Sequence, residues 1–100
     1  MPAPAPPSVP AVRARILELA RRARGSICPS AVARSFFAAR AQWAPLMPLV
    51  RSVAAALIAS GREGAGADAG RLVCTQRGAV VGDPREARGP IRLRWERDAA

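Results

Sequence analysis

Residues 71–81, RLVCTQRGAVV, decide the fold, because the spacing of apolar residues changes there from a helical to a strand period. Leu72–Gln76 is rich in β-forming residues, and the Arg77-Gly78 step that follows suits a turn. Residues 91–95, IRLRW, then alternate strictly between apolar and basic side chains. The last third of the chain therefore predicts a small antiparallel β-hairpin or sheet with one buried face and one arginine-bearing face.

Three helices are expected before this point, because apolar residues recur there at spacings of three and four. Gly25 and Gly61 end the first and third helices, and Pro29 suits the first position of the second. Arg40–Gln42 are expected to connect the second helix to the third. The expected helices cover about residues 9–24, 29–39 and, starting at 45 or 48, up to residue 60.

Three helices followed by a hairpin with a basic loop is the layout of a winged helix-turn-helix, so we expect this α+β fold. One domain is expected over residues 11–97. Residues 1–10, with five prolines, are expected to form a disordered tail, and residues 98–100 a short one. Residues 61–70, GREGAGADAG, are expected to be a flexible glycine-rich insertion.

The charge of the chain favours a polyanionic partner. All sixteen basic residues are arginines, and they face seven acidic residues, for a net charge of +9. Arginine presents a planar fork of donors that suits phosphate, so a basic balance of this size favours nucleic acid. A GC-rich coding sequence accounts equally well for the lack of lysine, but it does not account for the excess of basic over acidic residues.

Residue types suited to catalysis or metal binding are scarce. The chain has no histidine, tyrosine or lysine, and Cys28 and Cys74 lie too far apart for the usual zinc spacings. Cys28 precedes a predicted helix, which could lower its thiol pKa and suit a redox role; a packing role is favoured, since no acid–base partner is visible. We therefore expect no enzyme activity, no cofactor and no metal.

Nothing in the sequence indicates export or a membrane span. No apolar run approaches the ~18–20 residues of a spanning helix, and the first residues lack the pattern of a signal peptide. A cytoplasmic location is expected, with both cysteines reduced and no membrane partner.

Several short segments together resemble a family of short bacterial proteins of unknown function, whose members resemble winged-helix domains. In chain order, the segments are ICPSAVAR at residues 27–34, Trp43, Leu46-Met47 and Val50-Arg51, TQRG at 75–78, and RGPIR at 88–92. Two departures stand out: Ala31 occupies a position where an acidic residue is common, and the glycine-rich segment after Gly61 looks like an insertion. The resemblance supports the fold and implies no catalytic site.

These features favour the binding of nucleic acid, namely DNA, with modest sequence preference. Gln42 is expected to read a base edge, because a glutamine amide can pair with adenine. Contacts to the phosphate backbone are expected from a set of arginines on the third helix, the hairpin and its loop. They are Arg51, Arg77, Arg85, Arg88, Arg92 and Arg94.

The alternative is an interaction module that binds a second copy or an acidic protein and no nucleic acid. Its surface would be the alanine-rich side of the third helix, with Ala54, Ala55, Ala56 and Ala59. Trp43 and Trp95 follow the apolar spacing of their elements, so both are interpreted as core anchors rather than as stacking platforms for bases.

Overall fold

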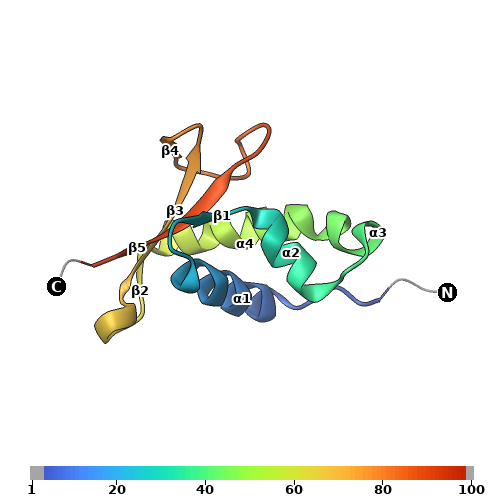
Figure 1. Cartoon of the computed structure of the whole chain (residues 1–100), viewed down its shortest axis with the longest axis horizontal. Coiled ribbons are helices and arrows are strands. Elements are labelled where there is room, and N and C mark those ends of the chain that lie inside the picture. Colours follow the sequence, from blue (N-terminus) through green and yellow to red (C-terminus); the bar gives the residue numbers. More distant parts are fainter. Residues whose placement is uncertain (1–3, 99–100) are drawn as a thin grey trace.

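The structure, a computed structural model, describes residues 4–98 and confirms the predicted α+β class with an antiparallel sheet (Figure 1). The helices are α1 (Val9–Arg22), α2 (Pro29–Phe36), α3 (Arg40–Trp43) and α4 (Met47–Ser60), with short 3₁₀ turns η1 (Ala44–Leu46) and η2 (Gly66–Asp68). The strands are β1 (Ser26–Ile27), β2 (Arg62–Glu63), β3 (Gly70–Gln76), β4 (Ala79–Val81) and β5 (Arg92–Arg97).

Helix α1 begins inside the predicted tail. The Ser8 hydroxyl accepts a hydrogen bond from the Ala11 amide at 3.2 Å, and Pro10 fits the first turn, where no N–H is needed. Val9 and Pro10 therefore belong to the helix, and the expected tail ends at Ser8. Residues 4–8 have no helix or strand, and residues 1–3, like 99 and 100 of the second tail, lie outside the described residues.

The connection before the third predicted helix is itself helical. Arg40–Gln42 belong to α3, and α3, η1 and α4 follow one another without a break from Arg40 to Ser60. The chain tightens into the 3₁₀ turn at Pro45, which has no N–H to donate to a regular α-helix. Helix α2 ends at Phe36, earlier than predicted, because Phe37 is extended.

The helical run Arg40–Ser60 is long and apolar enough to span a membrane by length and composition alone. The core helix of a soluble protein meets the same measure. Here α4 supplies Val50, Val53, Ala54 and Leu57 to the buried core, so its apolar character is used inside the fold.

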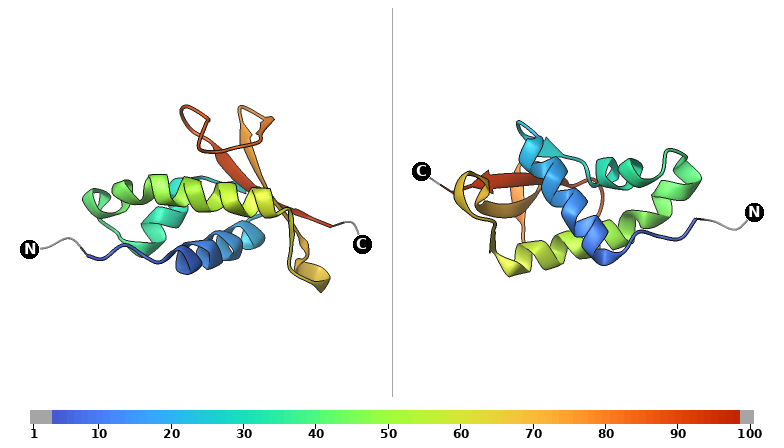
Figure 2. Two further views of the ribbon diagram at one scale, coloured as in Figure 1. Left: turned by 180° about the vertical axis from the view of Figure 1, so that it is seen from behind. Right: turned by 90° about the horizontal axis from the view of Figure 1, so that it is seen from below.

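The sheet has the order β1-β5-β3-β2, and β4 pairs with the same edge of β3 as β2 does, nearer the end of the strand. All pairings are antiparallel, and the longest runs from Gly70↔Arg97 to Thr75↔Arg92. The helices gather on one side of this sheet, while the β3–β4 end rises beyond them (Figures 1 and 2). The predicted alternation in β5 is confirmed, because Leu93 and Trp95 are buried and Arg92 and Arg94 exposed.

The glycine-rich segment 61–70 is more regular than predicted. It contains β2, which pairs with β3, and the η2 turn. Positive φ angles at Gly64 and Gly66 accompany the reversal of the chain between β2 and β3.

Strand β3 packs closely against the Trp95 ring at Gly70, at the end of the sheet farthest from the β3–β4 turn. Trp95 is 8% exposed, and its indole lies between the Arg21 guanidinium, 4.6 Å from the ring centroid, and the backbone of Gly70. A Cβ at Gly70 would meet the Glu96 carbonyl oxygen and lie 2.9 Å from the Trp95 ring. Only glycine leaves room for the indole here.

Substitution of Gly70 by alanine is expected to lower the free energy of unfolding by about 1–3 kcal/mol, the usual cost of overpacking. Urea unfolding followed by tryptophan fluorescence measures it. Gly25→Ala is the matched control, because a Cβ there has no heavy atom within 4 Å. Equal losses in both variants would contradict the close packing at Gly70.

Candidate nucleic-acid interface

The end of the sheet beyond the helices forms a projecting arm, defined here as residues 75–91 (Figure 1). Its first half is the β3–β4 hairpin, closed by the two-residue turn Arg77-Gly78. Both turn residues have positive φ angles, 53° and 82°, as in the type I′ turn that matches the twist of paired strands. Its second half is the loop from Gly82 to Ile91, which returns the chain to β5.

Hydrogen bonds from Arg51 hold this loop against the helical layer. Its guanidinium on α4 donates to the carbonyl oxygens of Pro84 at 3.2 Å, Ala87 at 2.9 Å and Gly89 at 2.8 Å. Pro84 itself is fully buried, which gives the loop a second point of attachment. Arg51 was expected to contact phosphate, but its donors are used on the protein itself.

Gln76 joins the two halves of the arm. Its side-chain amide, one residue before the turn, donates to the carbonyl oxygens of Arg88 and, at 3.2 Å, of Pro90. The turn that carries Arg77 and the loop segment that carries Arg88 are therefore held side by side. Sequence reasoning did not select Gln76 as a site residue; its place beside an Arg-Gly turn in the TQRG segment was the available signal.

Three of the sequence segments noted above thus meet at one place. Val50-Arg51 lies on α4, TQRG forms the turn of the hairpin, and RGPIR forms the end of the loop. The hydrogen bonds of Arg51 and Gln76 connect them across 12 to 38 residues of sequence.

The predicted arginines divide into two groups. Arg77 and Arg88 are exposed, and within residues 4–98 neither forms a hydrogen bond or ion pair through its side chain. The other predicted arginines beyond α4, one in the loop and two on β5, are engaged. Arg85 binds Asp83 at 2.8 Å, Arg92 donates to the Ser26 hydroxyl and carbonyl at 2.8 Å, and Arg94 lies 3.3 Å from Glu96.

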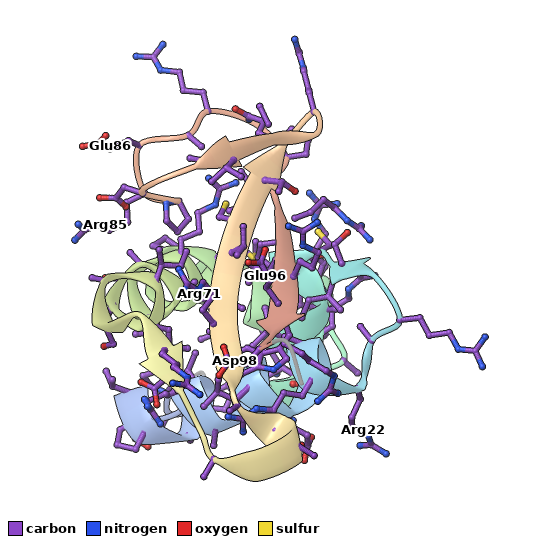
Figure 3. The ribbon with its side chains drawn as sticks, turned by 90° about the vertical axis from the view of Figure 1, so that its left-hand side faces the viewer. Arg22, Arg71, Arg85, Glu86, Glu96 and Asp98 are labelled. Atoms are coloured by element: carbon purple, nitrogen blue, oxygen red, sulfur yellow. The ribbon has the colours of Figure 1, made fainter. Side chains whose placement is uncertain are left out.

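The Asp83–Arg85 pair shapes the start of the loop. Asp83 accepts hydrogen bonds from both the backbone amide and the guanidinium of Arg85, and these bonds hold the pKa of its carboxyl below the usual range. Figure 3 shows Arg85 and Glu86 on the side of the arm, away from its ends. The pair offsets one positive charge there, so the charges of the arm without an ion pair are those of Arg77, Arg88 and the exposed Glu86.

The third predicted helix offers little to a base edge. Gln42 is exposed, but it lies on α3, at the other end of the helical layer from the arm (Figure 1). The exposed positions of α4 carry small or cyclic side chains: Pro48, Ser52, Ala56, Ala59 and Ser60. The alanine surface of the alternative hypothesis is also reduced, because Ala54 and Ala55 are buried.

A hollow of about 830 Å³ lies at the far end of the sheet from the arm. Its arginines are engaged: Arg62 forms an ion pair with Asp98, and Arg97 donates to the Ala67 carbonyl at 2.9 Å. Both arginines that line this hollow are therefore engaged, in contrast to Arg77 and Arg88 of the arm.

The two cysteines have opposite surroundings. Cys28 is partly exposed, and although partial burial raises its pKa, the Ser30 hydroxyl bond at 3.0 Å and the charges of Arg92 and Arg34 leave the pKa lowered overall. Cys74 is fully buried, and that burial raises its pKa. Within residues 4–98 no group of three or more His, Cys, Asp or Glu side chains could hold a metal ion.

A comparison with protein-family models matches residues 10–96 to the family described as "Protein of unknown function (DUF3253)". The match extends from the first turn of α1 almost to the end of β5, and so includes the arm. A search of curated proteins finds no match.

Substitution of Arg51 by glutamine is expected to lower the free energy of unfolding by about 1–3 kcal/mol, because three carbonyl oxygens lose a charged donor. Amide hydrogen exchange in residues 82–90 should accelerate more than in α1. Arg22→Gln is the control, since Arg22 is exposed and makes no side-chain hydrogen bond within the described residues. An unchanged exchange rate in the loop would show that Arg51 does not hold it.

Native protein treated with iodoacetamide should react at Cys28 and spare Cys74, because only Cys28 is accessible and only its pKa is lowered. As pH rises, the rate at Cys28 should level off below the ordinary thiol pKa. Peptide mapping by mass spectrometry measures both rates, with urea-unfolded protein as the reference. Equal labelling of the two cysteines in the native protein would contradict this difference in their surroundings.

Proposed function

The chain belongs to the DUF3253 family of proteins of unknown function, and we propose that it is a winged-helix domain that binds duplex DNA. The order of its elements supports this fold: a helix, a short strand, further helices and a terminal hairpin, with the sheet order β1-β5-β3. In this proposal the arm is the wing and α4 is the third helix of a helix-turn-helix.

The observation that carries the proposal is the pair of unengaged arginines on the arm. Arg77 and Arg88 are exposed, and Gln76 keeps their backbones together. Two guanidinium groups on a fixed support suit a polyanion, because little side-chain and backbone freedom is lost when they bind.

The distribution of charge adds to the attraction. Within residues 4–98, six of the seven acidic residues form an ion pair with an arginine, and the seventh, Glu86, lies exposed on the side of the arm. The net charge of +9 steers a polyanion toward the protein over a distance of about one Debye length. Arg71 on β3 is a further exposed arginine, on the face of the sheet that the helices leave open (Figure 3).

Modest sequence preference follows from the surface of α4. Direct reading of the major groove needs long donors or acceptors, and the exposed face of this helix carries proline, serine and alanine side chains. The proposal assigns the chain no catalytic role, and its affinity rests on backbone contacts from arginines.

The double variant Arg77→Glu with Arg88→Glu is expected to abolish the shift of a duplex DNA fragment in a gel, or to weaken binding at least tenfold in fluorescence anisotropy. If each arginine displaces one counterion, their loss lowers the slope of log affinity against log salt by about 1.8.

The matched control is Arg22→Glu with Arg24→Glu. It changes the net charge by the same amount, and Figure 3 shows Arg22 well below the arm, on the other side of the sheet's edge from it. Equal loss in the two double variants would indicate nonspecific attraction without a role for the arm. If the wild-type protein does not bind duplex DNA at low salt but forms a dimer, the alternative hypothesis of an interaction module is favoured instead.

A further inference from the structure

We propose that the arm enters the minor groove of duplex DNA and prefers A·T-rich sequence, with Arg77 and Arg88 as the inserted side chains. This inference rests on the proposed function and names the groove and the base composition that the arm would select.

The two ends of the arm are slender. Arg77 is followed by Gly78 and Arg88 by Gly89, and both glycines have positive φ angles, 82° and 85°. No Cβ stands beside either arginine on its C-terminal side, and an added Cβ at Gly78 would meet no heavy atom within 4 Å. Each guanidinium therefore stands at the tip of a narrow loop, and a narrow loop is required for entry into a groove about 6 Å wide.

Gln76 makes the two arginines act as a unit. Its amide binds the carbonyl oxygens of Arg88 and Pro90, while Gln76 itself pairs with Ala79 across the turn that presents Arg77. Arg51 holds the other side of the same loop through Gly89. Gln76 and Arg51 are thus positioning residues, and the arginines reach the groove without first ordering a flexible segment.

The chemistry of the two ends favours the narrow minor groove of A·T-rich DNA. That groove has an enhanced negative potential, and arginine enters it readily because its guanidinium is more weakly hydrated than an ammonium group. Arg85 of the loop is held by Asp83, and Arg92 and Arg94 of β5 are held by Ser26 and Glu96, so Arg77 and Arg88 are the arginines of the arm with free donors. The groove would be read by its width and potential, without long side chains on α4.

The experiment compares the affinity of the full chain for two duplexes of equal length, one containing an A-tract and one only G·C pairs. We expect about tenfold tighter binding to the A-tract duplex, a difference of the size that single base-pair changes produce. Netropsin, which occupies the minor groove, should displace the protein from the A-tract duplex.

Two variants test the mechanism without removing charge. Arg77→Lys with Arg88→Lys should keep the salt slope but reduce the A-tract preference to less than about twofold, because lysine does not share the weak hydration of arginine. Gln76→Leu should reduce the preference in the same direction, since it frees the two ends without changing a charge. Thermal unfolding of each variant confirms that it is folded.

The outcomes separate this inference from the proposed function. Equal affinity for the two DNA duplexes, or binding that netropsin leaves intact, overturns the minor-groove inference and leaves DNA binding in place. Equal affinity for double-stranded RNA also overturns it, because the minor groove of A-form RNA is wide and shallow. If the variant with both lysine substitutions keeps the preference for the A-tract duplex, Arg77 and Arg88 are not the cause of that preference. Failure to bind any duplex overturns the proposed function itself.

Discussion

The hydrogen bonds of Arg51 are the interaction on which the shape of the exposed arm depends. Arg51 stands on α4 between the buried residues Val50 and Val53, so its backbone is fixed by the core. Its guanidinium reaches three carbonyl oxygens in a loop that has no helix or strand of its own. A loop of this kind would otherwise be among the least stable parts of a domain. The core thereby determines where residues 82–90 lie, and Gln76 extends that order to the turn of the hairpin.

Some arginines stabilise the fold, and others keep their side chains free on the surface. Some are parts of the fold: Arg21 covers Trp95, and Arg92 closes the edge strand β1 through Ser26. Others pair with acidic residues, and exposed pairs of this kind add little stability. Each pair cancels one positive and one negative charge, and the excess of arginines over acidic residues, +9, leaves the field of the molecule positive. A small number, among them Arg77 and Arg88, keep their donors free for a partner.

Much of the fold could be predicted, because its determinants are local. The starts of α1 and α2, the turn at Arg77-Gly78 and the two faces of β5 follow from caps, prolines, glycines and alternation within a few residues. Arg40–Gln42 was wrongly assigned as a connection, since a 3₁₀ turn lets helix continue through Pro45. The regular structure of the glycine-rich segment was missed because β2 owes its place to a pairing with β3, which composition does not reveal.

The sequence alone determined the α+β class, the excess of arginine and the alternation that buries Leu93 and Trp95 while exposing Arg92 and Arg94. It did not determine what each arginine does. The partners of Arg51 lie 33 to 38 residues away and those of Arg92 lie 66 residues away, so only the packing of α4 and β1 against the sheet brings them within hydrogen-bonding distance. Secondary structure is determined mainly by residues that are close together in the sequence. The partners of a guanidinium group depend instead on which oxygen atoms lie near it in space. For that reason tertiary structure alone separated Arg77 and Arg88 from the arginines that hold the fold together.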